Sequence, residues 1–157
     1  MELLNGVTGF YQEPKDKPPT TSLNQFKVHS YEAARTNNGE LLECNDTNVH
    51  SNFLVSTLKI REKEVYVLLN KHYPLISFAS SVNEEKIFFV DDKKLNLFFS
   101  TFYRVLHTEL LNERLLYTHH KSSILIKKDN ELNNAELTQI AYWKPNTLGE
   151  MLYNYWD

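Results

Sequence analysis

The stretch Phe53-Leu-Val-Ser-Thr-Leu-Lys-Ile60, the link Arg61-Glu62-Lys63 and the stretch Glu64-Val-Tyr-Val-Leu-Leu69 carry the clearest pattern in the chain. Both long runs are rich in β-branched and apolar residues, which favours two strands joined by a tight polar turn. Apolar side chains occupy both alternating sets of positions in the second run. We therefore expect a sheet whose central strands are covered on both faces.

Two further apolar runs extend this pattern, at Leu75–Ala79 and Lys86–Val90, with the polar segment Ser80–Glu85 between them. Consecutive strands joined by short links usually pair as antiparallel neighbours. The sequence therefore predicts an antiparallel meander over residues 53–90. With helices packed on it, the chain belongs to the α+β class.

A helix should follow the meander. Asp91 and Asp92 are good helix-capping residues, and large apolar residues then recur at helical spacing: Leu95, Phe98, Phe99, Phe102 and Leu106. This spacing predicts one core helix over residues 92–106, laid across the sheet. We expect the rings of Phe98 and Phe102 to be buried, since an aromatic stripe at this spacing is typical of a core.

The N-terminal part should supply a second helix. Residues 1–10 fit a short strand or a tucked arm, and the proline-rich residues 11–21 fit a loop. Ser22 is a good N-cap, and the helix should end near Asn37-Asn38-Gly39, where a left-handed cap is easily formed. A short strand over Leu41–Cys44 is one interpretation of the polar stretch that follows.

The segment after the core helix is harder to assign. Residues 109–117 fit either a helix continuation or a strand. Ser123–Lys127 reads as a strand, residues 128–134 as a polar turn, and Glu136–Trp143 as the hairpin partner of that strand.

The last stretch, Ile140-Ala-Tyr-Trp-Lys-Pro-Asn-Thr-Leu-Gly-Glu-Met-Leu-Tyr-Asn-Tyr-Trp-Asp157, holds both tryptophans. Pro145 should stop a strand over residues 140–143, because proline cannot donate to a ladder. Thr147-Leu-Gly-Glu150 has the form of a capping box, which predicts a short closing helix. We expect its apolar side chains to plug into the core, and a binding surface of Tyr and Trp is the alternative.

Trp143-Lys-Pro-Asn-Thr-Leu-Gly-Glu150 and Leu152-Tyr-Asn-Tyr-Trp-Asp157 resemble the C-terminal signature of small bacterial immunity proteins of polymorphic and contact-dependent toxin systems. The opening Leu4-Asn-Gly-Val-Thr-Gly-Phe10 is similar to that family as well. The resemblance covers about a fifth of the chain and includes no catalytic motif. It implies a non-enzymatic cytoplasmic inhibitor, a monomer that binds one cognate toxin domain, for example a nuclease. It carries over no binding residues, because such families vary most where they contact their toxins.

Composition limits the alternatives. The 157 residues suffice for one domain over residues 1–157, and an apolar content of 41% argues against disorder. A net charge of −3 offers no basic footprint for nucleic acid. The single Cys44 rules out an internal disulfide and suits a reducing compartment. We find no signal peptide and no apolar run near the about 20 residues that cross a bilayer, so we expect a soluble cytoplasmic protein.

Five acidic residues are the candidate partner-binding residues: Glu40, Glu43, Asp46, Glu84 and Glu85. No core periodicity includes them, and they cluster in two polar segments. The simpler interpretation is a solvated loop surface. The functional interpretation is an anionic face for a basic nuclease toxin, because complementary charge raises the association rate.

Catalytic and metal sites are weakly indicated. The pair His119-His120, with His107 earlier, lacks a third ligand, and adjacent residues on a strand point apart. Acid–base catalysis by one of these histidines with Glu113 has no orienting partner in the sequence. We therefore expect no metal and no catalytic residue.

Two other chemical motifs are equally weak. Cys44 could pair with His50 as a nucleophile, but the neighbouring acids Glu43 and Asp46 would raise the thiol pKa, which opposes activation. Gly6-Val-Thr-Gly9 lacks the strand–helix unit of a dinucleotide fingerprint, so we expect no cofactor. The leading hypothesis is an immunity protein. An interaction module with another partner and a small histidine-dependent enzyme stay open as alternatives.

Overall fold

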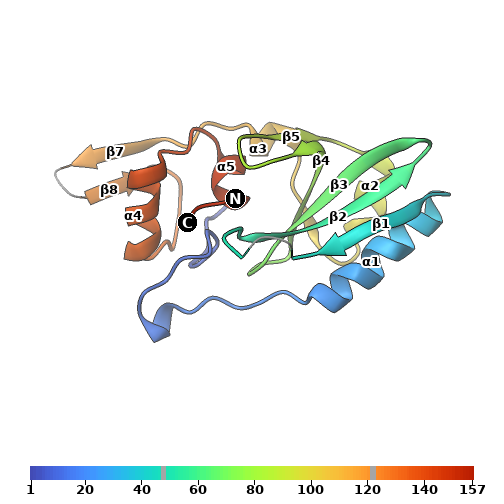
Figure 1. Cartoon of the computed structure of the whole chain (residues 1–157). Helices are drawn as coiled ribbons and strands as arrows, with labels where there is room; N and C mark the ends of the chain where they lie inside the picture. Colours follow the sequence, from blue (N-terminus) through green and yellow to red (C-terminus); the bar gives the residue numbers. More distant parts are fainter. Residues whose placement is uncertain (47–48, 121–122) are drawn as a thin grey trace.

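The computed structural model describes residues 1–46, 49–120 and 123–157, and a six-stranded sheet lies at its centre (Figure 1). Five strands follow one another across the sheet in chain order: β1 (Glu40–Asn45), β2 (Phe53–Ile60), β3 (Lys63–Asn70), β4 (Leu75–Val82) and β5 (Ile87–Val90). All neighbouring pairs among them are antiparallel. The short strand β6 (Arg104–Val105) pairs in parallel with the start of β4. The predicted meander and the α+β class are confirmed.

The tight turn between β2 and β3 is also confirmed. Arg61 and Glu62 both have positive φ, at 53° and 64°. Two consecutive residues in this left-handed region form the turn whose twist matches an antiparallel hairpin. The turn fixes the register, which pairs Ile60 with Lys63 and continues without a shift to Phe53 and Asn70.

Helices α1 (Leu23–Thr36) and α2 (Lys93–Phe99) pack on one face of the sheet. Ser22 caps α1 by accepting a hydrogen bond from the Gln25 backbone, and Asn38 beyond its end has φ of 58°. Both predicted ends of this helix are confirmed. The buried side chains beneath the two helices come from alternating positions of β2, β3 and β4: Leu54, Leu58, Val67, Leu69, Ile76 and Phe78.

The predicted core helix over residues 92–106 is too long. Asp92 does cap it, by accepting from the Leu95 backbone, but α2 ends at Phe99. The chain then turns, and the amide of Leu106 donates to Ile76 O, so pairing with β4 ends the helix. The burial predicted for Phe102 is wrong, because its side chain is 48% exposed, whereas Phe99 is fully buried. Phe98 is only partly buried.

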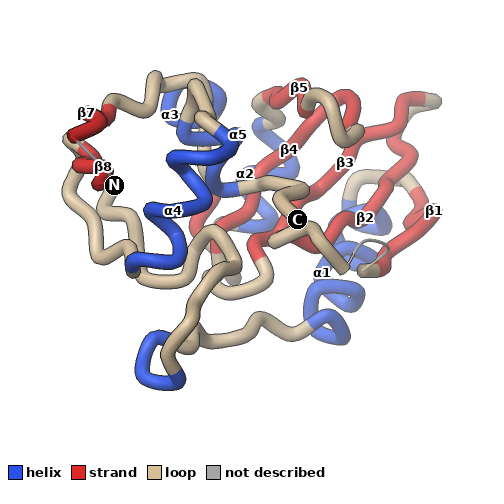
Figure 2. The backbone as a smooth tube through the Cα atoms, turned by 60° about the vertical axis from the view of Figure 1, so that its left-hand side comes forward, coloured by secondary structure: helices blue, strands red, loops and turns tan. Residues whose placement is uncertain are grey.

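The other face of the sheet is covered by both ends of the chain. The remaining elements are the 3-10 helix η1 (Pro14–Asp16), α3 (Thr108–Leu111), β7 (Tyr117–His120), β8 (Ser123–Ile126), α4 (Asn134–Trp143) and α5 (Leu148–Leu152). Figure 2 shows α4 and α5 between the β7–β8 pair and the large sheet. One buried cluster runs from Leu3 to Trp156, so the two termini share a core.

Residues 136–143 form a helix, which corrects the prediction of a hairpin strand there and at 140–143. The partner of β8 is β7. Strand β7 begins at Tyr117, the last residue of the segment 109–117 that the sequence left open. A helix is favoured over a strand here because Asn133 and Glu136 form a complete capping box at its start. Tertiary packing and this cap override the β-propensity of the residues that follow.

The closing helix is confirmed at α5. Thr147 accepts from the Glu150 backbone, as a capping box requires, but the Glu150 carboxylate accepts from the Asn146 amide instead of from Thr147. Tyr153 and Trp156 follow the helix and are buried, with 2% and 8% exposure. The part of the stretch from Leu148 to Trp156 therefore packs into the core as predicted, whereas Tyr142 and Trp143 are exposed.

Three buried asparagines tie the N-terminal arm to this plug. The side-chain amides of Asn52 and Asn70 each donate to Val7 O and to Leu152 O. The amide of Asn154 donates to Thr8 O. The two segments that carry the family resemblance, 4–10 and 143–157, thus meet in space. Buried main-chain groups need such partners, because an unsatisfied one is costly.

Candidate partner-binding groove

A groove lies between the β4–β5 turn and the C-terminal stretch, with a volume of about 470 Å³. Residues 83–87 and Phe89 contribute one part of its lining, and residues 143–147 and the end of the chain contribute another. We call it the C-terminal groove. Its volume falls within the usual range of ligand sites.

Close packing of α5 on β5 builds the groove. At Gly149, a Cβ atom would lie 2.6 Å from Cε2 of Phe89 and 2.9 Å from Leu111 O, so only glycine allows this approach. Tyr153 anchors the next turn, because its hydroxyl donates to Leu75 O and accepts from the Ser77 hydroxyl. Burial raises the pKa of Tyr153, so its hydroxyl keeps its proton.

Aromatic rings form the apolar part of the groove. The rings of Trp143 and Trp156 are parallel within 2°, with centroids 6.5 Å apart. Trp156 is buried and also contacts Phe10, while Trp143 is 40% exposed and donates to Gln139. Tyr142 is 74% exposed and meets the Trp143 ring edge-on. Exposed, oriented Trp and Tyr rings are typical hot spots of protein interfaces.

Carboxylates line the same groove. Glu84 and Glu85, which we call the turn acids, line the groove and are exposed. Glu150 of α5 also lines the groove and is exposed. The pKa of Tyr155 is raised, first by burial and then by the charge of Glu84. The negative charge of Glu84 therefore acts on Tyr155 near the end of the chain.

Lys86 and Lys144 also line the groove, but the ammonium group of Lys86 contacts a ring that is not part of the lining. Nζ of Lys86 lies 4.7 Å from the ring centroid of Phe88, a cation–π contact. Phe88 is not part of the groove lining, whereas its neighbours Ile87 and Phe89 are. Lys144 is exposed at the end of α4, where its backbone takes a left-handed conformation. The groove therefore keeps an acidic excess.

The structure separates the five predicted acids into two groups. Glu40 and Glu43 lie on β1, with Asp46 just beyond it, and we call these three the β1 acids. Strand β1 and strand β5 are opposite ends of the strand order, so the β1 acids and the turn acids do not share a site. Asp46 is paired with Lys71 at 2.8 Å, and Glu43 accepts from the Asn45 side chain.

Among the described side chains, the histidines considered as ligands or bases are not assembled into a site. Nδ1 of His107 lies 3.6 Å from the Asp91 carboxylate, which also accepts two hydrogen bonds from Thr108. His119 is exposed on β7, and the side chain of His120 lies outside the described residues. Among the residues that the structure describes, no three His, Cys, Asp or Glu side chains are placed to hold a metal ion.

The other chemical candidates have separate partners. Glu113 pairs with Lys128 at 3.2 Å, and His50 pairs with Asp157 at 3.0 Å. The pKa of the Cys44 thiol is raised to about 11, mainly by burial, so the thiol is not activated as a nucleophile. The sequence predicted the direction of this shift but attributed it to neighbouring acids.

Sequence reasoning missed Glu136, a buried carboxylate on α4. One oxygen accepts from the amides of Gly6 and Asn133, and the other accepts from the amide and the hydroxyl of Thr8. Its pKa is raised, because burial outweighs these donated bonds. The signal was present in the sequence, since Asn133 and Glu136 have capping-box spacing.

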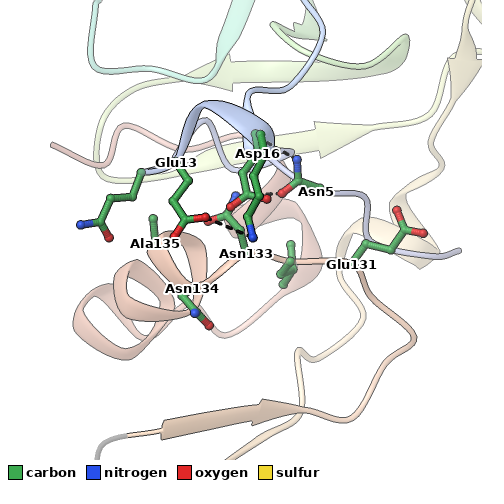
Figure 3. A pocket seen from close by; sticks show the side chains of 10 residues that line it. Asn5, Glu13, Asp16, Glu131, Asn133, Asn134 and Ala135 are labelled. Atoms are coloured by element: carbon green, nitrogen blue, oxygen red, sulfur yellow. Dashed lines mark hydrogen bonds and ion pairs between the residues drawn. The ribbon is translucent and has the colours of Figure 1, made fainter.

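A second hollow, of about 340 Å³, lies beside this cap, between η1 and the start of α4 (Figure 3). Its polar groups largely bind one another. The Asn5 amide donates to Asp16 O, the Asn133 amide donates to Asn5 Oδ1, and Lys15 pairs with Glu13. The contacts in this hollow therefore hold the N-terminal arm in place, and the C-terminal groove is the better candidate site.

No protein-family model matches the chain, and neither a curated protein nor a solved structure gives a match. No helix among the described residues is long and apolar enough to span a membrane.

Proposed function

We propose that this chain is a non-enzymatic immunity protein, which binds a cognate bacterial toxin domain in the cytoplasm and neutralises it. The observation that carries the proposal is the C-terminal groove, whose lining combines the exposed ring of Trp143 with the turn acids and Glu150. The resemblance of residues 4–10 and 143–157 to immunity proteins supports the same reading.

The groove has the features that protein recognition uses. Trp143 offers a large apolar surface in the groove, and Tyr142 adds an exposed ring beside it, outside the lining. The contact of each ring with its neighbour limits the entropy lost on binding. The acidic surroundings suit a basic partner. A nuclease toxin is such a partner, because an enzyme that binds nucleic acid needs cationic residues for the phosphates. The toxin would bind in a 1:1 complex with a monomer of this chain.

The proposal is tested in cells. We would co-express the chain with the toxin domain encoded by the neighbouring gene and measure growth. The wild-type chain should protect, whereas Trp143→Ala combined with Glu85→Lys should lose protection. Tyr31→Ala is the control, since Tyr31 is an exposed aromatic residue of α1 and does not line the groove. His119→Ala should also protect, because inhibition by binding requires no catalytic histidine.

Two outcomes would count against the proposal. If the wild-type chain fails to protect against the neighbouring toxin domain, the chain is not its immunity protein, and an interaction module with another partner becomes the better reading. If His119→Ala alone abolishes protection while the protein stays folded, a histidine-dependent enzyme becomes the better reading.

A further inference from the structure

Strand β5 leaves one edge of the large sheet open. It is the last strand in the sheet order, and β4 is its only partner among the described strands. The carbonyl of Lys86 accepts from Asn83 and that of Phe88 accepts from the Ser80 hydroxyl, so both point toward β4. Because hydrogen-bonding direction alternates along a strand, the N–H and C=O groups of Ile87 and Phe89 point away from β4.

This open edge borders the C-terminal groove. Ile87 and Phe89 both line the groove, together with Lys144 and Asn146. A chain segment lying in the groove in an extended conformation would therefore have main-chain donors and acceptors of β5 beside it. Trp143 lines the same groove and would contact the side chains of that segment. Addition of a strand to a sheet edge is a common mode of peptide recognition, in which main-chain bonds give affinity and neighbouring pockets give specificity.

Charge indicates the chemistry of such a segment. Glu85 and Glu150 line the groove with Glu84, while the ammonium group of Lys86 lies over the ring of Phe88. Lys144 is the remaining basic residue of the lining. This balance favours a segment that carries Lys or Arg and disfavours an acidic one, because like charges at an interface are costly.

The opposite edge of the sheet is less suited to the same role. Strand β1 carries a register shift between Leu41 and Glu43, and a bulge of this kind interrupts the row of free main-chain groups. Glu40 and Glu43 add charge to that edge, which is a common way to block pairing with another chain.

We propose that the partner adds an extended segment bearing Lys or Arg to the edge of β5 at Ile87 and Phe89, within the C-terminal groove. This inference rests on the proposed function for the identity of the partner, a toxin domain. The mode of binding, however, is a property of β5 and the groove and has its own test.

The first test uses one residue. Ile87→Pro removes the outward N–H donor and leaves the bonds to β4, since proline is tolerated at the first residue of an edge strand. Ile87→Val keeps the donor and is the matched control. We expect the proline variant to bind the toxin domain roughly tenfold more weakly, because one main-chain bond is lost and its acceptor is left unpaired. The valine variant should bind like the wild type.

Hydrogen exchange in the complex of wild-type protein gives a second measurement, independent of any variant. Strand addition should slow exchange at the Ile87 and Phe89 amides when the toxin domain binds. Unchanged exchange at both amides overturns the inference even if the toxin domain binds tightly, and the immunity function then stands. A folded Ile87→Pro variant with wild-type affinity overturns it as well.

A peptide probe separates this inference from the proposed function. If the neighbouring toxin domain does not bind, that function fails, and an acetylated (Val-Lys)3 peptide is titrated against the full chain. Amide shifts at Ile87 and Phe89 that are absent with (Val-Glu)3 would support strand addition by a basic segment. No shift with the lysine peptide, or equal shifts with both peptides, would overturn it.

Discussion

Glu136→Gln is the substitution that most sharply tests how the N-terminal arm is held. The Glu136 carboxylate is fully buried and accepts four hydrogen bonds, from the amides of Gly6, Thr8 and Asn133 and from the Thr8 hydroxyl, at distances of 2.6–3.2 Å. A glutamine has the same shape but only one acceptor oxygen. Its NH2 group must therefore face two of the four donors.

The magnitude follows from counting those donors. If the glutamine oxygen keeps the bonds to Gly6 and Asn133, its NH2 group faces the amide and the hydroxyl of Thr8. The hydroxyl can rotate and accept, but the amide is left without an acceptor. One orphaned buried donor costs about 1–3 kcal/mol. Removal of the buried charge offsets part of that cost, so we expect a net loss of about 1–2 kcal/mol in the free energy of unfolding at neutral pH.

The direction in which the free energy of unfolding changes with pH gives a second expectation. The pKa of Glu136 is raised in the folded state, so its protonated form is favoured there relative to the unfolded chain. The stability that this residue contributes is therefore fully present below its unfolded pKa and is lost as pH rises through the folded pKa. The free energy of unfolding of the wild type, relative to that of Glu136→Gln, should decrease as pH rises from about 4 toward 7.

Urea unfolding of both proteins across this pH range is the assay, with hydrogen exchange at Gly6 and Thr8 as a local readout. Glu131→Gln is the control, because Glu131 is exposed near the start of the same helix and should change stability by less than about 0.5 kcal/mol. If Glu136→Gln and the wild type unfold alike at every pH, and the two amides exchange at the same rate, the carboxylate does not hold the arm.

Further predictions concern the core and the groove. Phe99→Ala should lower the free energy of unfolding by about 3–5 kcal/mol, whereas Phe102→Ala should cost less than about 1 kcal/mol because its ring is half exposed; equal losses in thermal melts would contradict this. Gly149→Val should destabilise the chain by several kcal/mol, since its side chain meets Phe89 and Leu111 O, and a normal melting temperature would refute the packing. Charge reversal of the turn acids should slow association with the toxin domain and reduce its salt dependence, measured by stopped flow. The same reversal at the β1 acids tests the other predicted acidic surface, and a larger effect there would move the interface to β1.

The meander could be predicted because its residues carry local signals that tertiary structure did not override. Runs rich in β-branched residues at 53–60 and 64–69, with the short polar link Arg61-Glu62-Lys63 between them, already predict a hairpin. The structure places Lys63 in β3, so the turn itself has two residues. The end of α2 could not be predicted in the same way. The helical spacing continues to Leu106, but the amide of Leu106 bonds to Ile76 O instead. A parallel pairing with a strand 30 positions earlier in the chain leaves no local signal.

The helix at 134–143 shows a signal that was overlooked. The aromatic and β-branched residues of this segment favour a strand, yet Asn133 and Glu136 have the spacing that identified the helix after Thr147. The groove, in contrast, could not be derived. The polar segment between two strands makes Glu84 and Glu85 candidates, but that they line one groove with Trp143 depends on the packing of α5 against β5.

The most direct test of the immunity function is a calorimetric titration of the purified chain with the toxin domain encoded beside it. We predict saturable binding with one toxin domain per chain, and a loss of about 2 kcal/mol or more in binding free energy for Trp143→Ala, as for an interface hot spot. The Tyr31→Ala control should bind like the wild type. Absence of binding heat with the wild-type chain would contradict the immunity function. Wild-type affinity of Trp143→Ala would show that the C-terminal groove is not the contact surface.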